Sequence, residues 1–392
     1  KSFTIIKSNR QLNETYLQFY DPLPSVSKFA EYLNQISCSE LSSHLSEYCI
    51  DRVNTLKTAS TLDISLLFKS NTATISSFTS FQKKILSLQI PNELISEFKA
   101  RYEVGLLTKH QSRGPEEMSL GGFLIVLGTD VTPTPTVFSF SSRHHSSNDS
   151  FKSSFLEPSG MHPNLELRVS DVTAFEENQS CKLYAYLTLP RTIFIDKYQF
   201  IDKLFLEDRN IAELGYISDN VDLEAPEYTI GTWGTVVLIR LTQPSAKLNQ
   251  GREWVARVPT HLRYLLPISK KNGIREIEIP FPIMFWACAT EETFDFSKNP
   301  FDRVHLGYDG LFNPNTLFYH LKPYATWDDG RLVSSLKVPV LDLDNSDLVE
   351  KWTYIAIGFG FFWVLSCLLK VFIKTGYAST YKEAIDSKRK TQ

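Results

Sequence analysis

The sequence lacks the motifs of the common catalytic classes. Its 392 residues contain no Gly-x-Ser-x-Gly, no His-Glu-x-x-His and no Walker loop. Asp342 and Asp344 have the D-x-D spacing with which many glycosyltransferases hold a metal, but the sequence offers no further ligands beside them. His144 and His145 are consecutive, so their side chains point apart on a strand or loop. We therefore expect no catalytic residue, no metal site and no cofactor.

A large net charge is also lacking. The chain has 41 Lys and Arg residues against 44 Asp and Glu residues, and its formal net charge is −3. This composition has no strongly basic character, so we expect no nucleic-acid partner. The first 30 positions hold no apolar run of the kind found in signal peptides. Whether a signal peptide was removed, or whether a later segment directs the chain to a membrane, stays open.

One long apolar run lies near the C-terminus, from Trp352 to Ile373. Eighteen residues pass without a charge, and Val-Phe-Ile follows Lys370. A helix of this length spans about 30 Å, the thickness of a bilayer's hydrocarbon core. Trp352 and Tyr354 at one end and Lys370 at the other are suited to the membrane interface. We predict a transmembrane helix over 352–373 and a lipid bilayer as its surroundings, because a buried core helix is seldom so long and apolar on all sides.

The charges on either side of this run predict its orientation. Residues 374–392 carry five Lys and Arg against two acidic residues, whereas residues 342–351 carry four acidic residues against one lysine. Because Lys and Arg stay on the cytosolic side, residues 374–392 are predicted to be a cytosolic basic tail and residues 1–351 to be lumenal. Lys388 and Lys390 resemble the dilysine signal that returns membrane proteins to the endoplasmic reticulum.

The cysteines predict disulfides in an oxidising compartment. Cys367 lies inside the apolar run and is interpreted as a small apolar residue. The other four cysteines allow three pairings. We favour Cys38–Cys49 and Cys181–Cys288, because each pair falls within one expected domain. Three sequons predict N-glycosylation on the same side of the membrane, at Asn13, Asn148 and Asn178.

Residues 1–110 are predicted to form a mixed α/β region. Apolar residues recur at helical spacing after Ser27 and after Ser39. The same spacing between Leu94 and Tyr102 indicates a third helix, and Leu62–Phe68 has the pattern of a strand.

Residues 111–345 are predicted to form a lumenal, antiparallel β-sandwich. The high aromatic content of 13% favours strands. Short segments with alternating or continuous apolar patterns follow one another with Pro and Gly turns between them. The polar stretch from Ser142 to Phe151 is predicted to be a loop. The expected strands are 122–128, 137–141, 164–169, 182–189, 235–241, the pair 274–279 and 282–288, and 336–340.

Six features of residues 115–373 occur in the same order as in a known family. They are Cys181 with a strand ending at Leu189-Pro190, then Ile195, Asp196 and Tyr198, then Glu224–Tyr228, then His261–Pro267, then Cys288, and finally the run at 352–373. In these features the sequence resembles the PIG-X family. Other unusual stretches are Gly160–Pro163 and 299–312. The resemblance does not extend to residues 1–110, whose role it leaves open.

The resemblance implies a role in making glycosylphosphatidylinositol (GPI) anchors. PIG-X proteins are accessory subunits of GPI mannosyltransferase I. Their partner is a polytopic, PIG-M-type catalytic subunit that transfers the first mannose from dolichyl-phosphate mannose to the glucosaminyl-phosphatidylinositol precursor. The resemblance thus implies a non-catalytic, stabilising subunit in the endoplasmic reticulum membrane. Two other classes stay open: a general lumenal chaperone or quality-control factor, and a glycan-binding β-sandwich protein.

Two sets of residues are expected to meet the partner. Within the span, small residues allow helices to pack closely in lipid. One helical face is formed by Ala356, Gly360, Trp363 and Cys367. In the lumenal domain, His261, Arg263 and Tyr264 are candidate contacts. The alternative for these three residues is a polar cluster that braces the sheet.

Overall fold

The computed structural model describes residues 4–7, 15–18, 25–59, 61–67, 72–78, 102–111, 114, 117–157, 160–170, 181–218, 221–243, 254–269, 273–290, 295–296, 299, 307–324 and 332–389. The chain divides into two compact units. The first consists of residues 1–264 and 277–336, and the second of residues 265–276 and 337–392. The fold below is given for the described residues.

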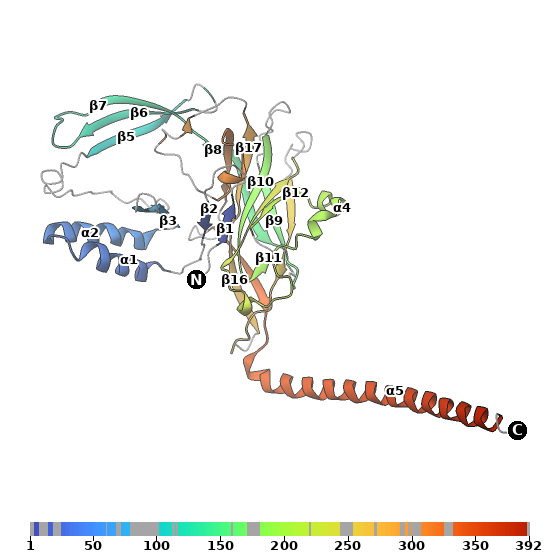
Figure 1. Cartoon of the computed structure of the whole chain (residues 1–392). Helices are drawn as coiled ribbons and strands as arrows, with labels where there is room; N and C mark the ends of the chain where they lie inside the picture. The colour runs from blue at the N-terminus through green and yellow to red at the C-terminus, as the bar shows by residue number, and fades with distance from the viewer. Residues whose placement is uncertain are drawn as a thin grey trace. The chain divides into compact units, whose positions relative to one another are not determined.

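An eight-stranded sheet is the main element of the first unit (Figure 1). Its order is β12-β13-β10-β17-β18-β8-β9-β14. Neighbouring strands are antiparallel except β18 and β8, which are parallel. The strands are β8 (His144–Phe155), β9 (Asn164–Ser170), β10 (Cys181–Pro190), β12 (Ile211–Ile217), β13 (Gly234–Leu241), β14 (Trp254–Pro259), β17 (Ile283–Ala289) and β18 (Thr316–Pro323).

The two edges of this sheet come back into contact with each other. The backbone N–H of Arg257 in β14 donates to the carbonyl of Arg209, just before β12, at 3.0 Å. Asn210 adopts a left-handed backbone conformation, which asparagine tolerates well, and its side-chain amide donates to the carbonyl of Val255 at 2.8 Å. The mainly β architecture is therefore confirmed. Four of the expected strands, at 164–169, 182–189, 235–241 and 282–288, belong to one curled sheet with a parallel pair, and those at 122–128, 137–141, 274–279 and 336–340 belong to smaller sheets.

Aromatic side chains form the densest part of the core. Phe285 of β17 stacks on Tyr308 with ring centroids 4.6 Å apart and meets Phe318 of β18 edge-on at 5.3 Å. Tyr186 of β10 packs edge-on against Tyr308 at 5.5 Å. Such pairs contribute about 0.5–1.5 kcal/mol each beyond the burial of their area. They tie the segment around Tyr308 to three strands of the sheet.

Smaller elements lie between and after the strands of the main sheet along the chain. The two-residue strands β11 (Ile193–Phe194) and β15 (His261–Leu262) pair, as do β16 (Ile274–Pro280) and β19 (Val333–Pro339). The short helices η3 (Gln199–Ile201) and α4 (Lys203–Glu207) follow β11. The short helices η4 (Glu227–Thr229), η7 (Asp309–Leu311) and η8 (Leu343–Asn345) precede β13, β18 and the last helix.

Helices and strands are mixed before residue 144. The helices are α1 (Ser27–Leu33), η1 (Asn34–Cys38), α2 (Ser43–Thr55) and η2 (Leu56–Thr58), which confirm the two helices predicted after Ser27 and Ser39. The strands are β1 (Thr4–Lys7), β2 (Thr15–Gln18), β3 (Thr61–Leu67), β4 (Thr72–Phe78), β5 (Glu103–His110), β6 (Glu117–Val126) and β7 (Thr134–Ser141). The helix expected between Leu94 and Tyr102 lies outside the described residues, apart from Tyr102 itself.

The prediction of a loop from Ser142 to Phe151 is wrong, because most of this stretch belongs to β8. Apart from Phe151, its inward-facing positions are small or polar, so the usual apolar alternation is hidden. Ser147, Asp149 and Ser153 are buried on that face. The carboxylate of Asp149 accepts a hydrogen bond from the indole N–H of Trp286 at 2.8 Å, which satisfies both groups in the interior.

The predicted pairing of 274–279 with 282–288 is not found. The two segments are strands, but β16 pairs with β19, and β17 lies between β10 and β18. The turn at Phe281 sends them to different sheets, and the backbone N–H of Phe281 donates to the carbonyl of Leu332 at 3.0 Å.

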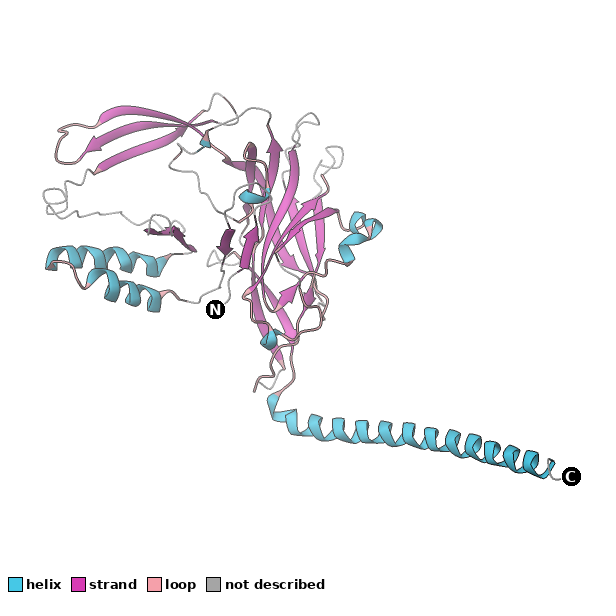
Figure 2. Ribbon diagram, in the orientation of Figure 1, coloured by secondary structure: helices cyan, strands magenta, loops and turns pink. Residues whose placement is uncertain are grey.

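The second unit contains the helix α5 (Ser346–Arg389), which includes the predicted span at 352–373 (Figure 2). By length and composition, residues Leu343–Thr375 are able to cross a membrane, and none of their most apolar window is buried. The helix does not end with the apolar run but continues through the basic segment that follows Ile373.

Candidate functional site

Both favoured cysteine pairs are disulfides in the structure. Cys181 and Cys288 lie directly opposite each other on β10 and β17, with their Cα atoms 4.0 Å apart. Cys38 at the end of η1 is joined to Cys49 of α2. Cys367 is a free, exposed cysteine on α5.

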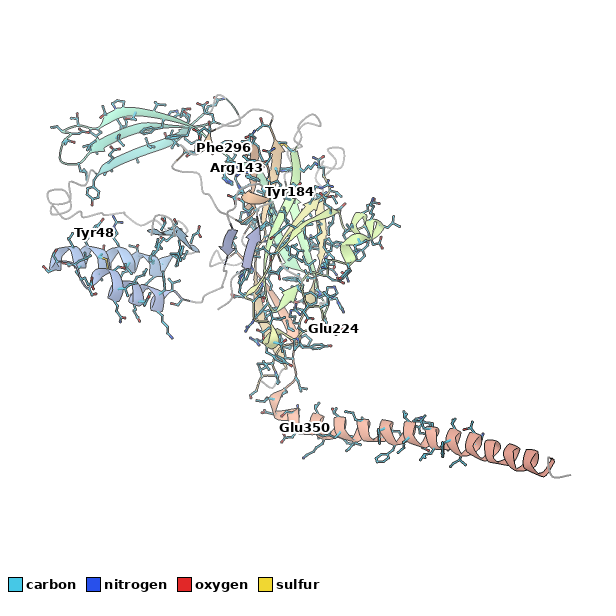
Figure 3. All side chains as sticks on the ribbon, in the orientation of Figure 1. Tyr48, Arg143, Tyr184, Glu224, Phe296 and Glu350 are labelled. Carbon is cyan, nitrogen blue, oxygen red and sulfur yellow. A yellow bond between two sulfur atoms is a disulfide. The ribbon has the colours of Figure 1, made fainter. Side chains whose placement is uncertain are left out.

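Four of the unusual sequence stretches meet at one place. Strand β11 pairs with β15 through Ile193↔Leu262 and Phe194↔His261. The N–H of Leu262 donates to the carbonyl of Met161 at 2.9 Å, and the N–H of Glu227 donates to the carbonyl of Tyr264 at 3.0 Å. We call this the motif cluster and define it as residues 160–163, 193–198, 222–228 and 261–264. Figure 3 labels Glu224, one of its members.

A histidine pair forms part of the motif cluster. Nδ1 of His162 lies 3.0 Å from Nδ1 of His261, with the two rings nearly perpendicular. Phe194 stacks on His261 with centroids 5.3 Å apart. Burial and then His162 lower the pKa of His261, whereas Asp196 raises it. His261 is therefore neutral at pH 7, and a single proton between the two Nδ1 atoms completes the hydrogen bond.

Charged side chains hold the motif cluster together from within. Arg263 is only 5% exposed, and its guanidinium donates to the carbonyl of Ala225 at 2.6 Å and lies 4.4 Å from the Phe194 ring centroid. Burial lowers the pKa of Arg263, and Asp222 opposes this shift. Nε of Arg191 donates to the buried carboxylate of Glu227 at 2.6 Å. Arg263 therefore braces the cluster, as in the second interpretation of the His261–Tyr264 stretch.

Three tyrosines are among the exposed residues of the motif cluster. Tyr264 is 70% exposed although it directly follows the buried Arg263, and Tyr198 and Tyr228 are more than half exposed. A tyrosine offers a large rigid surface with one polar group, which suits it to protein interfaces. Of the three residues expected to meet a partner here, Tyr264 is the one that the structure leaves accessible over most of its surface.

A second histidine pair lies in the aromatic core. Nδ1 of His144 in β8 is 3.1 Å from Nε2 of His320 in β18, and the Tyr308 hydroxyl is 3.3 Å from the same Nε2. Beside them, Arg143 donates to the backbone carbonyls of Thr316, Asp309 and Asn313. Figure 3 labels Arg143, which directly precedes β8. These bonds fix the segment 309–316 to the start of β8.

This pair predicts a loss of stability in acid. Burial first, and then His320 and Arg143, lower the pKa of His144 to about 3, and burial and His145 lower that of His320 to about 4. Both are neutral when folded but take up protons below about pH 6.5 when unfolded, so stability falls as the pH drops from 6.5 toward 4. Each histidine should make the free energy of unfolding about 2 kcal/mol lower at pH 5 than at pH 7.

Thermal unfolding of the full chain in detergent at pH 7 and pH 5 measures this effect. We expect the His320→Phe variant to show a smaller change in Tm between the two pH values than the wild type. The exposed His110→Gln variant serves as the control and should keep the wild-type change. An equal pH dependence in all three proteins would contradict the assignment.

The histidine pairs are hydrogen-bonded pairs rather than parts of larger ligand sets. Among the residues that the structure describes, no group of three or more His, Cys, Asp or Glu side chains could hold a metal ion. The Asp342 carboxylate accepts a hydrogen bond from the N–H of Asp344 at 3.1 Å and so caps η8. The D-x-D spacing is thus explained locally by a helix cap.

The remaining candidate residues are placed as follows. Asn148 is exposed on β8, whereas Asn13 and Asn178 lie outside the described residues. The four residues predicted to form a partner-binding face, Ala356, Gly360, Trp363 and Cys367, lie on α5 and are all exposed.

The residues that sequence reasoning missed are Arg143, Asp149, Trp286 and His320. For His320, alternation with Phe318 along β18 was a usable signal.

Comparison with known proteins identifies the family. A family model described as PIG-X / PBN1 matches residues 158–369. The chain is 39% identical to protein pbn1 of Neurospora crassa over 98% of this chain and 75% of that protein. It is 37% identical to protein pbn1 of Emericella nidulans over 92% of this chain and 70% of that protein, and 36% identical to protein PBN1 of Gibberella zeae over 96% and 74%. Similarity therefore extends into residues 1–110, beyond the predicted resemblance, and the chain belongs to the PIG-X/PBN1 family.

Proposed function

We propose that this chain is a non-catalytic, stabilising subunit in GPI-anchor biosynthesis. In this proposal it resides in the endoplasmic reticulum membrane, with its sheet in the lumen and its basic C-terminal segment in the cytosol. It holds a polytopic, PIG-M-type mannosyltransferase in a stable, competent form. That partner transfers the first mannose from dolichyl-phosphate mannose to glucosaminyl-phosphatidylinositol.

The family match carries the proposal, because it covers seven of the eight strands of the sheet and most of the candidate span. The geometry supports a structural role. Polar side chains of the motif cluster have partners: His162 with His261, Glu227 with the neighbouring Arg191, and Arg263 with the backbone carbonyl of Ala225. Among the residues that the cluster exposes are three tyrosines, which suit a protein-binding surface.

Two surfaces would hold the partner. The exposed tyrosines of the motif cluster, Tyr264 above all, would contact its lumenal loops, with His261 and Arg263 positioning them. Within the membrane, the face of Ala356, Gly360, Trp363 and Cys367 would pack against one of its helices. Gly360 allows the two backbones to approach closely there.

The proposal is tested by purification in mild detergent followed by a mannosyl-transfer assay in membranes with and without the chain. We expect one stoichiometric polytopic partner and a loss of transfer when the chain is absent. Many substoichiometric clients would instead indicate a general chaperone, and sugar-dependent retention a glycan-binding protein. Mannose transfer by the purified chain alone would contradict the non-catalytic role.

The same purification tests the span with a matched pair of variants. A Cβ at Gly360 or at Gly358 meets nothing within 4 Å in this chain, so neither substitution disturbs the chain itself. The two positions are about 200° apart around the helix and so face opposite ways. Gly360→Leu should reduce co-purification of the partner about tenfold, and Gly358→Leu should leave it unchanged. Equal recovery from both would exclude this face.

A further inference from the structure

The chain beside the start of α5 is folded into a compact, hydrogen-bonded layer. The N–H of Ile268 donates to the carbonyl of Leu341 at 3.2 Å, and the N–H of Leu343 donates back to the carbonyl of Ile268 at 3.1 Å. A bridge joins Ile268 to Asp342, and the N–H of Val340 donates to the carbonyl of Gly273 at 2.7 Å. We call residues 265–269, 273–276 and 337–345 the collar. All of them belong to the second unit, together with α5.

Gly273 is needed for this arrangement. Its φ is +55°, a conformation that side chains with a Cβ rarely adopt, and a Cβ there would lie 3.0 Å from the carbonyl oxygen of Val340. The collar is therefore held by specific backbone geometry, and the residues that it carries have defined positions relative to residues 340–343.

Leucines of the collar are exposed around the bridge. Leu266 is 50% exposed, Leu341 47% and Leu343 45%. They lie on both bridged segments, within two residues of Ile268 or Asp342. Contact of these exposed leucines with water is unfavourable. A surface that takes them out of water would therefore stabilise the collar.

The length of the candidate span indicates what that surface is. Its 33 residues run from Leu343 to Thr375, which is about 50 Å of helix. This exceeds the 30 Å hydrocarbon core and is close to the full bilayer with its headgroups, about 40–45 Å. With the hydrocarbon core at 352–373, Leu343 lies nine residues before it, about 13 Å of helix, so the collar, which is bonded directly to Leu343, is expected at the outer surface of the headgroup layer.

Charge does not keep the collar away from a bilayer. Residues 265–276 contain two more cationic than anionic side chains, and residues 337–351 contain two more anionic than cationic ones. The net charges of the two segments cancel. The transfer of the leucines from water into the bilayer surface therefore decides whether the collar binds there. We propose that the collar rests on the bilayer surface, with Leu266, Leu341 and Leu343 inserted into the headgroup layer. This inference needs only the span and not the proposed partner.

Nitroxide labels on the full chain in phosphatidylcholine nanodiscs test the proposal. The free thiol is removed by Cys367→Ala, and one label is placed through Leu266→Cys or Leu341→Cys. Val131→Cys in the turn after β6 serves as the aqueous reference and Leu368→Cys in the span as the lipid reference. We expect the accessibility to oxygen relative to a nickel chelate at 266 and 341 to be severalfold higher than at 131 and lower than at 368. Adding anionic lipid should not change it.

Two outcomes would overturn the inference. Ratios at 266 and 341 equal to that at 131 would show that the collar stands in water. Protection from both probes that appears only when a protein partner is added would assign the leucines to that partner rather than to lipid. Because both label sites are half exposed, the labels leave the packing intact, and circular dichroism of each labelled chain checks this directly.

Discussion

Replacing Gly234 by alanine is expected to be among the most damaging single changes in this protein. Gly234 begins β13 and pairs with Pro190 at the end of β10. A Cβ at this position would overlap the carbonyl oxygen of Leu189 and lie 3.0 Å from Cα of Pro190. Both obstacles are backbone atoms of a central strand, so no side chain can move aside. We expect a loss of about 3 kcal/mol or more, a large part of the stability of an ordinary domain.

Gly231 provides a matched control three residues earlier. A Cβ there meets nothing within 4 Å, so Gly231→Ala should leave stability nearly unchanged. Thermal unfolding of both variants in detergent makes the comparison, and we expect Gly234→Ala to lower Tm by about 10 °C. If the two variants had the same Tm, the close approach of β10 and β13 would not be a feature of the folded protein.

Removing the disulfide between Cys181 and Cys288 should have a comparably large effect. The bond closes a loop with a sequence separation of 107. In the chain-entropy model, a loop of this length stabilises the folded state by about 4–5 kcal/mol. The Cys181→Ala/Cys288→Ala double variant should therefore unfold at a much lower temperature than the wild type. Peptide mapping without reduction checks the premise, and free thiols at both positions in the wild type would refute it.

The second disulfide allows an internal comparison. Cys38 and Cys49 are separated by only 11 residues, for which the same model gives about 3 kcal/mol. Cys38→Ala/Cys49→Ala should thus lower stability less than the first double variant does, and its effect should be confined to α1, η1 and α2. A larger loss from the shorter loop would contradict the entropic explanation.

Much of the sheet could be predicted because its strands carry local patterns. Apolar residues recur at every second position in Asn164–Ser170 and in Cys181–Leu189, and β13 is a continuous apolar run that is buried along nearly its whole length. The strand β8 was not predicted from the sequence, because Ser147, Asp149 and Ser153 occupy inward positions normally held by apolar residues. Their partners, such as Trp286 for Asp149, are far away in the sequence, so no local pattern shows that these polar groups are satisfied.

The candidate site was only partly visible in the sequence for a similar reason. The stretches around His162, Phe194, Glu227 and Arg263 stood out one by one, but their meeting depends on strands of two residues each and on single backbone hydrogen bonds. No periodicity can reveal such pairings. The same limit explains why the sequence left open whether Arg263 braces the cluster or meets a partner; in the structure Arg263 is buried and donates to the carbonyl of Ala225.

The position of β18 between β17 and β8 bears on the order in which the protein can be assembled during synthesis. β18 is the last strand of the eight to leave the ribosome, yet it lies in the middle of the sheet and separates β12-β13-β10-β17 from β8-β9-β14. Until it arrives, both halves expose an unpaired strand, and the parallel pairing with β8 spans more than 150 residues of chain. Pro323 precedes Trp352 by only 29 residues, so the sheet can be completed only when synthesis has nearly reached the candidate span. Nascent chains stalled before β18 should therefore be the form that chaperones and proteases recognise.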